Sequence, residues 1–212
     1  MIITWSKSSS PQAADRATFW LQEMIQAAQK YPEHVTRPRP TLFATVLAAW
    51  ERQVTADPHK AVRYGQLLWE LMHQYCTQSK AGNRPKIIPS SAYYMYISLL
   101  SKSNLKDAPT KAEEVLHQMI QAGKINSGVI PSCPVFVNVI SSWRNSGSPD
   151  AAERAQGVLN LLVHEYKRRS KGQKDSLKIN DAPFNATIHA WAMAPTKSNN
   201  EISHFHAEKQ IS

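Results

Sequence analysis

The chain has 212 residues, a formal net charge of +9 and 42% hydrophobic residues, which excludes a disordered chain because enough apolar surface is present for a core. We find no run of about 18 apolar residues, so we predict no membrane-spanning helix, and the first residues contain neither a secretory signal nor an organelle transit peptide. The positive charge favours acidic partners such as nucleic acid. Cys76 and Cys133 match no metal-binding spacing, so we predict two free thiols in packed helices.

Two kinds of helix alternate along the chain, and we name them helix A and helix B. Residues 1–38 form a partial repeat, with the end of a helix A around Trp5 and a helix B that begins at Pro11. The repeat 39–89 combines a helix A, which opens at Phe43, with a helix B from Pro58. In each helix the apolar residues recur at i, i+3, i+4 and i+7, which is the spacing of one helical stripe.

The same pair recurs in residues 90–131 and 132–180, and a last helix A lies in the partial repeat 181–195. A repeat of roughly 40 to 50 residues made of two helices is typical of a solenoid, since stacking buries the apolar stripe that each hairpin leaves open. We predict a poorly ordered tail over 196–212, where the stripe is weak. Because both ends lack polar caps, we expect the chain to be a segment of a longer array.

Helix B starts carry a consistent signal. Ser10-Pro11, Asp57-Pro58 and Ser148-Pro149 each place a good N-cap residue before a proline that suits the first helical turn. We therefore predict helices that begin at these prolines, with the serine or aspartate as N-cap. Three tryptophans, Trp50, Trp143 and Trp191, end the stripes of successive A helices, and we predict that they are packing residues.

The chain resembles the pentatricopeptide repeat family, in its long-repeat variety. The resemblance rests on Phe184-Asn-Ala-Thr-Ile-His-Ala-Trp191, on Ser148-Pro-Asp-Ala-Ala-Glu-Arg-Ala155 and on Ala112-Glu-Glu-Val-Leu-His-Gln-Met119, and it covers about residues 1–195. It implies an all-α, right-handed α-solenoid of antiparallel helix hairpins that binds single-stranded RNA along the A helices. It also implies an adaptor role in RNA maturation, stability or translation in a mitochondrion or plastid. Tetratricopeptide repeats, which bind proteins, rank second.

In this family two or three side chains of each repeat read one base. The resemblance places the main reading position directly after the aromatic residue that opens helix A, and a second position shortly before the next helix A. The main positions are Ala44, Tyr94, Val137 and Asn185, and the second positions are Arg39, Pro89, Ser132 and Asn180. Only Asn185 is the usual residue type. Ala44 and Val137 offer no hydrogen bond to a base, and Tyr94 either stacks on a base or packs between helices.

A basic cluster closes the helix B of the repeat 132–180 and includes Lys167, Arg168, Arg169 and Lys171. These side chains either contact phosphates or complement the negative end of the helix dipole, and we favour the second interpretation.

The sequence contains no phosphate-cradling glycine loop, no His-Glu zinc helix and no serine elbow, so we predict no catalytic residue, metal, cofactor or small-molecule substrate. The main hypothesis is a single-stranded RNA-binding adaptor. The alternative is a protein-interaction scaffold that binds a peptide in the same groove. Polar and basic side chains along the groove would favour RNA, and apolar or acidic ones would favour a protein.

Overall fold

The computed structural model describes residues 1–77, 87–170 and 178–194, and in these ranges the chain forms helices and no strand. The A helices are α1 (Ile2–Lys7), α3 (Pro40–Gln53), α5 (Ser90–Ser103), α7 (Cys133–Asn145) and α9 (Ala182–Ala192). The B helices are α2 (Ala13–Lys30), α4 (Pro58–Thr77), α6 (Ala108–Ile125) and α8 (Ala151–Ser170). The all-α prediction is confirmed for this part of the chain. The tail predicted over 196–212 lies outside the described residues.

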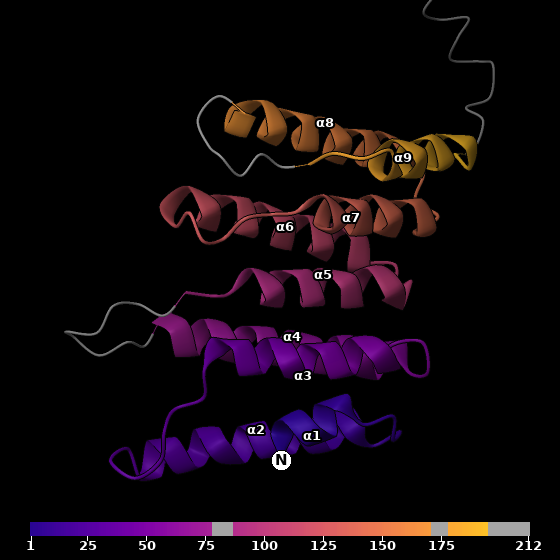
Figure 1. Ribbon diagram of the computed structural model, residues 1–212. Coiled ribbons are helices and arrows are strands. Elements are labelled where there is room, and N and C mark those ends of the chain that lie inside the picture. Colours follow the sequence, from indigo (N-terminus) through magenta and orange to yellow (C-terminus); the bar gives the residue numbers. More distant parts are fainter. Residues whose placement is uncertain (78–86, 171–177, 195–212) are drawn as a thin grey trace, which may run out of the picture.

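Successive helix pairs lie in layers, from α1 and α2 at one end to α8 and α9 at the other (Figure 1). Each A helix from α1 to α7 packs against the B helix that follows it, and neighbouring A helices pack against one another. Each B helix also packs against the following A helix. In the described part, each helix packs closely only against helices that are one or two places away from it in chain order. Each repeat range expected from the sequence therefore contains one helix pair, and α9 alone occupies the last range.

The apolar stripes form one continuous core. Phe43, Leu47, Leu100, Phe136 and Ile140 are fully buried, as the helical spacing predicts. In the middle of the stack, the ring of Trp69 on α4 packs against Tyr93 and Tyr96 on α5, with 5.1 Å between centroids in each pair. Burial raises the pKa of both tyrosines, with a smaller contribution from nearby acidic groups, so both phenols stay neutral.

The B helices do not all begin as predicted. α4 starts at Pro58, and the Asp57 carboxylate accepts a hydrogen bond from the backbone N–H of Lys60 at 2.9 Å, as an N-cap should. The N-cap predictions for Ser10 and Ser148 are wrong. Each serine carbonyl instead accepts a hydrogen bond from the backbone N–H three residues on, at 3.0 and 3.1 Å, and α2 and α8 begin only after this turn. Asp57-Pro58 shows that a capping residue followed by proline can start a helix, so the Ser-Pro pair does not by itself decide between a cap and a turn.

Both cysteines are buried free thiols. Helix α5 ends at Asn104 in the left-handed region (φ 53°), and the turn between α7 and α8 uses Gly147 at φ 66°. These two residues let the chain reverse direction tightly between an A helix and its B helix.

Candidate nucleic-acid interface

One side of each A helix is turned away from the B helices. On α3 this side carries Thr41, Thr45, Ala48 and Arg52, which recur at helical spacing and lie opposite the buried residues Phe43 and Trp50. The equivalent positions on α5 and α7 continue the stripe, and we call the whole set the A-helix face. Its members on these two helices are Ser91, Met95, Ser98, Lys102, Pro134, Asn138, Ser141 and Asn145. All are exposed or half-buried except Ser98, and none is acidic.

The cations of the A-helix face are held by neighbouring groups. Glu51 lies beside the face, accepts a hydrogen bond from the Ser98 hydroxyl at 2.8 Å and forms an ion pair with Lys102. The guanidinium of Arg52 donates to the carbonyl of Ser6. The face therefore offers mainly uncharged hydroxyl and amide groups. The Nδ2 atom of Asn138 is buried and has no hydrogen-bond partner in the described part.

The four main reading positions lie at the edge of this face. Ala44 lies two helical turns before Glu51 on the same side of α3. This side faces α5, because Glu51 accepts a hydrogen bond from Ser98. Ala44 is consequently only 5% exposed, and Tyr94 and Val137 are half-buried against the core. Asn185 is exposed because no described helix follows α9. The structure spreads these positions over four layers, one to each layer.

The second set lies at the starts of A helices. Arg39, Pro89 and Ser132 have extended backbone and are the N-cap residues of α3, α5 and α7, without a side-chain capping bond. Asn180 is engaged differently. Its Oδ1 accepts hydrogen bonds from the backbone N–H of Ala182 at 3.3 Å and from the thiol of Cys133 at 3.4 Å. The Asn180 side chain therefore fixes the start of α9 against α7.

Two arginines of the basic cluster at the end of α8 share one buried carboxylate. Glu165 has a side chain only 3% exposed, and the guanidinium of Arg168 binds its carboxylate, with the closest contact at 2.7 Å. Arg169 is 8% exposed, lies 3.7 Å from the same carboxylate and donates to the carbonyl of Pro131 at 3.2 Å. Burial raises the pKa of Glu165, but the hydrogen bond and charge of Arg168, with the charges of Arg169 and His164, outweigh it and lower the pKa.

Arg168 pairs with Glu165 within α8, whereas Arg169 also ties the end of α8 to Pro131, just before α7. Lys167 is exposed and also has a partner. Lys171 lies outside the described residues. Arg168 and Arg169 are therefore held at the helix end by the buried carboxylate of Glu165, which is a more specific partner than the helix dipole.

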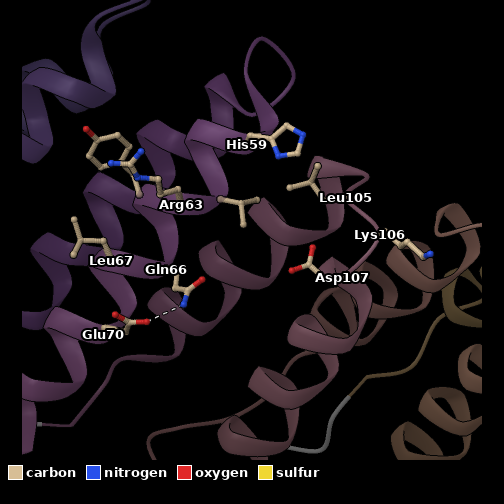
Figure 2. Close-up of a pocket in the computed structure, with 10 residues that line it drawn as sticks. His59, Arg63, Gln66, Leu67, Glu70, Leu105, Lys106 and Asp107 are labelled. Atoms are coloured by element: carbon tan, nitrogen blue, oxygen red, sulfur yellow. Dashed lines mark hydrogen bonds between the residues drawn. The ribbon is translucent and has the colours of Figure 1, made fainter.

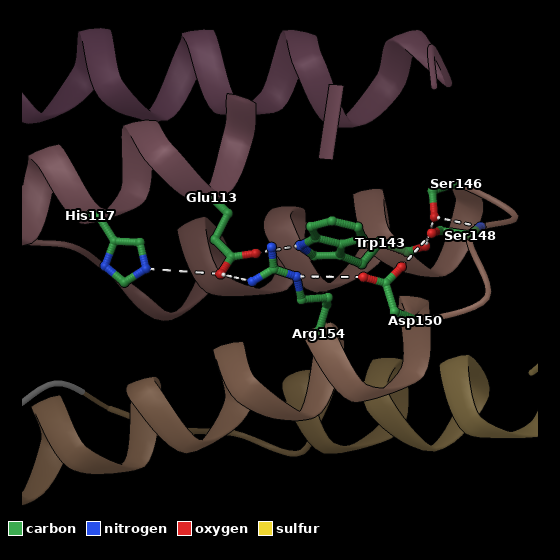
Figure 3. Close-up of polar contacts among 7 residues, drawn as sticks. All are labelled: Glu113, His117, Trp143, Ser146, Ser148, Asp150 and Arg154. Carbon is green, nitrogen blue, oxygen red and sulfur yellow. Dashed lines mark hydrogen bonds and ion pairs between the residues drawn. The ribbon is translucent and has the colours of Figure 1, made fainter. Parts of the chain in front are cut away.

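Sequence reasoning missed a polar contact that recurs between successive B helices. At the junction of α6 and α8, Trp143 donates its indole N–H to Glu113 at 2.8 Å, and the guanidinium of Arg154 lies 5.2 Å from the indole centroid and 3.5 Å from the same carboxylate (Figure 3). Asp150 and His117 extend this group at its two ends, as Figure 3 shows. We call this arrangement of carboxylate, indole and cation a Trp clamp.

A second Trp clamp joins α2 and α4. Lys60 pairs with Asp15 at 2.8 Å and lies 5.6 Å from the centroid of Trp50, whose indole N–H donates to Thr18 at 2.9 Å. The hydrogen bond to Asp15 raises the pKa of Lys60. Both clamps link a B helix to the next B helix through the tryptophan of the A helix between them. The signal in the sequence is an acidic residue in one helix B, a tryptophan that ends the next helix A, and a cation early in the next helix B.

Trp191 occupies the same repeat position as Trp50 and Trp143 but is 49% exposed, whereas the other two are 2% and 5% exposed. Phe184 and Ile188 of α9 are exposed for the same reason, because no described B helix covers them. The packing prediction is confirmed for Trp50 and Trp143 and is wrong for Trp191 in the described part.

No protein-family model, no curated protein and no solved structure matches this chain. Within residues 1–77, 87–170 and 178–194, no group of three His, Cys, Asp or Glu side chains is arranged to hold a metal ion. None of the described helices combines the length and apolar composition that crossing a bilayer requires.

Proposed function

We propose that this chain binds single-stranded RNA along the A-helix face, and that its stacked hairpins form a right-handed α-solenoid of the pentatricopeptide repeat kind. The observation that carries the proposal is the composition of the A-helix face. Over three successive layers it presents mainly hydroxyl and amide side chains, and the neighbouring carboxylate of Glu51 is engaged by Ser98 and Lys102. Such groups hydrogen-bond to phosphate oxygens, to the 2′-hydroxyl and to the edges of unstacked bases.

Base recognition should be weak over most of this face. Ala44 and Val137 have no side-chain donor or acceptor, so the layers of α3 and α7 contact RNA chiefly through neighbours such as Thr45 and Asn138. Tyr94 is half-buried, and its remaining ring surface is available for stacking on a base. Asn185 is the one main reading position that is both exposed and able to hydrogen-bond, so we expect base preference to be concentrated near α9.

The biological role that fits this proposal is an adaptor for RNA maturation, stability or translation in a mitochondrion or plastid, with no catalytic residue of its own. This role comes from the family resemblance. The alternative, a scaffold that binds a peptide on the same face, fits less well. Only Ala48, Met95 and Pro134 are apolar on the A-helix face, whereas peptide grooves of helical proteins are mostly apolar.

A charge placed on the A-helix face tests the proposal. The variant T41E/S91E adds two carboxylates at exposed positions of α3 and α5. Its control, Q26E/Q118E, adds the same charge at exposed positions of the B helices α2 and α6. Binding of each protein to a random single-stranded RNA pool is measured by filter binding at two salt concentrations.

We expect T41E/S91E to lose about tenfold or more in affinity, which corresponds to about 1.4 kcal/mol, whereas the control stays within about twofold of the wild type. Sequencing of the bound RNA then shows whether N185A relaxes a base preference. Equal losses in both double variants would mean that RNA senses only the net charge of the protein, and the proposed interface would be abandoned.

A further inference from the structure

Helix α9, at one end of the stack, carries the same apolar pattern as α7 (Figure 1). On α7, against which α8 packs, the isoleucine of this pattern, Ile140, is fully buried. On α9 the equivalent Ile188 is 64% exposed, and Phe184 and Trp191 are exposed with it. We call these three side chains the α9 stripe. A contiguous apolar surface of this kind marks an interaction site.

The α9 end of the stack holds two of the three parts of a Trp clamp. In both clamps the carboxylate lies four residues after the proline that opens a B helix, and the tryptophan ends the next helix A. Glu153 and Trp191 hold these two positions on α8 and α9. The indole N–H donates a hydrogen bond in both clamps, but that of Trp191 has no acceptor within the described part. The third part, a cation such as Lys60 or Arg154 near the start of the next B helix, comes from no described helix.

The junction of α4 and α6 shows that a clamp needs both residue types. There Val62 takes the place of the carboxylate and Leu100 the place of the tryptophan, and no clamp joins the two helices in the described part. A hollow of about 680 Å³ remains instead, lined among others by His59, Arg63 and Leu105 (Figure 2). The α9 end has the carboxylate and the tryptophan, so it belongs with the two clamped junctions and not with this one.

Neither the rest of this chain nor a second copy matches the helix that would complete the clamp. In each described B helix the sixth and thirteenth residues after the opening proline are apolar or aromatic and are buried or half-buried, namely Ala17 and Met24, Tyr64 and Leu71, Val115 and Ala122, and Ala155 and Leu162. After Pro195 the same places hold Glu201 and Glu208. A second copy has no spare B helix, because its own stack buries their apolar stripes. The α9 stripe therefore fits a helix of another protein.

We propose that the α9 stripe binds an amphipathic helix of a partner protein that carries a basic residue in its first two turns. The apolar residues of this helix, spaced i, i+3, i+4 and i+7, pack on the stripe as α8 packs on α7. Its cation lies over the ring of Trp191 and pairs with Glu153, as Arg154 does with the indole and carboxylate of the preceding junction. The surface shares no residue with the A-helix face, so this proposal does not depend on RNA binding.

The probe is a fluorescein-labelled peptide with the sequence of residues 148–170, because α8 covers α7 in the way proposed for α9. Two altered peptides carry R154E, at the clamp cation, and R168E, which gives the same net charge away from the clamp position. Binding to the full chain is measured by fluorescence anisotropy. The protein variants are I188N and E153Q, with I125N and E114Q as controls at exposed positions of α6. Circular dichroism establishes that all the proteins are equally helical.

We expect I188N to bind the unaltered peptide about tenfold more weakly than the wild type and E153Q about threefold more weakly, whereas I125N and E114Q bind it like the wild type. The R154E peptide should bind the wild type about tenfold more weakly than the R168E peptide.

Three results overturn the proposal. The first is a wild-type chain that does not bind the peptide, or binds it equally well with R154E and R168E. The second is binding that appears only after residues 195–212 are removed, which would mean that the chain covers α9 with its own end. The third is a dimer, seen by sedimentation, that is lost in I188N, which would mean that a second copy occupies the stripe.

Discussion

Replacing Trp50 by leucine should destabilise the stack strongly, because this change removes the indole from a Trp clamp. Trp50 is 2% exposed, stacks on Tyr64 with 4.7 Å between ring centroids, and donates to Thr18 at 2.9 Å. Truncating a buried tryptophan to alanine costs about 3–5 kcal/mol, and leucine restores part of the lost volume.

The expected loss in the free energy of unfolding can be built from these contacts. The packing left unfilled by leucine contributes about 2 kcal/mol, the stacking on Tyr64 about 0.5–1.5 kcal/mol, and the hydrogen bond about 1 kcal/mol. Thr18 still donates to the carbonyl of Ala14 at 2.8 Å, so its hydroxyl keeps one partner. Because the terms overlap, we expect a total of about 3 kcal/mol.

Trp191 provides a matched control at the same repeat position. It is 49% exposed, so W191L should cost about 0.5 kcal/mol or less. Both variants are unfolded in urea and followed by circular dichroism at 222 nm. With a slope of about 2 kcal/mol per molar urea, W50L should lower the midpoint by about 1.5 M, and W191L should barely move it. Equal shifts for the two variants would refute the claim that the clamp, rather than the indole itself, stabilises the stack.

Two further changes test the polar and the backbone packing. The pKa of Glu165 is lower in the folded chain than its ordinary value of 4.5, so its ionised form stabilises the fold above that pH, and this contribution is lost as the pH falls through the folded pKa. E165Q should therefore cost about 3 kcal/mol at pH 7 and progressively less in acid, as urea midpoints at several pH values will show, whereas the exposed E114Q should track the wild type. A Cβ on Gly123 would lie 2.5 Å from the backbone oxygen of Val129, so G123A should lower the melting temperature by an amount equivalent to about 1–3 kcal/mol. In G157A the new Cβ meets no atom within 4 Å, so this variant should raise the melting temperature by an amount equivalent to about 0.5–1 kcal/mol. A stabilising G123A would contradict the packing of α6 on the turn that follows it.

The helical content and the alternation of A and B helices could be read from the chain because the apolar period is a local property. Stripes such as Phe43, Val46, Leu47 and Trp50 can be buried together only on a helix, whatever lies beyond them. For the same reason the burial of Trp50 and Trp143 was predictable. The starts of α2 and α8 were not, since a Ser-Pro pair suits both a helix start and a turn, and the wider packing selected the turn.

The polar chemistry of the molecule depends on contacts between layers. Glu113, Trp143 and Arg154 belong to three different helices, and they meet only because successive hairpins stack with a particular offset. Arg169 at the end of α8 likewise donates to the carbonyl of Pro131, which precedes α7, so this part of the basic run is fixed by packing between helices. Periodicity along one helix carries no information about the offset between two hairpins, which is set by the shapes of the side chains that interdigitate between them. Helix and core therefore follow from the order of residues, whereas the clamps and the A-helix face follow from how the layers fit together.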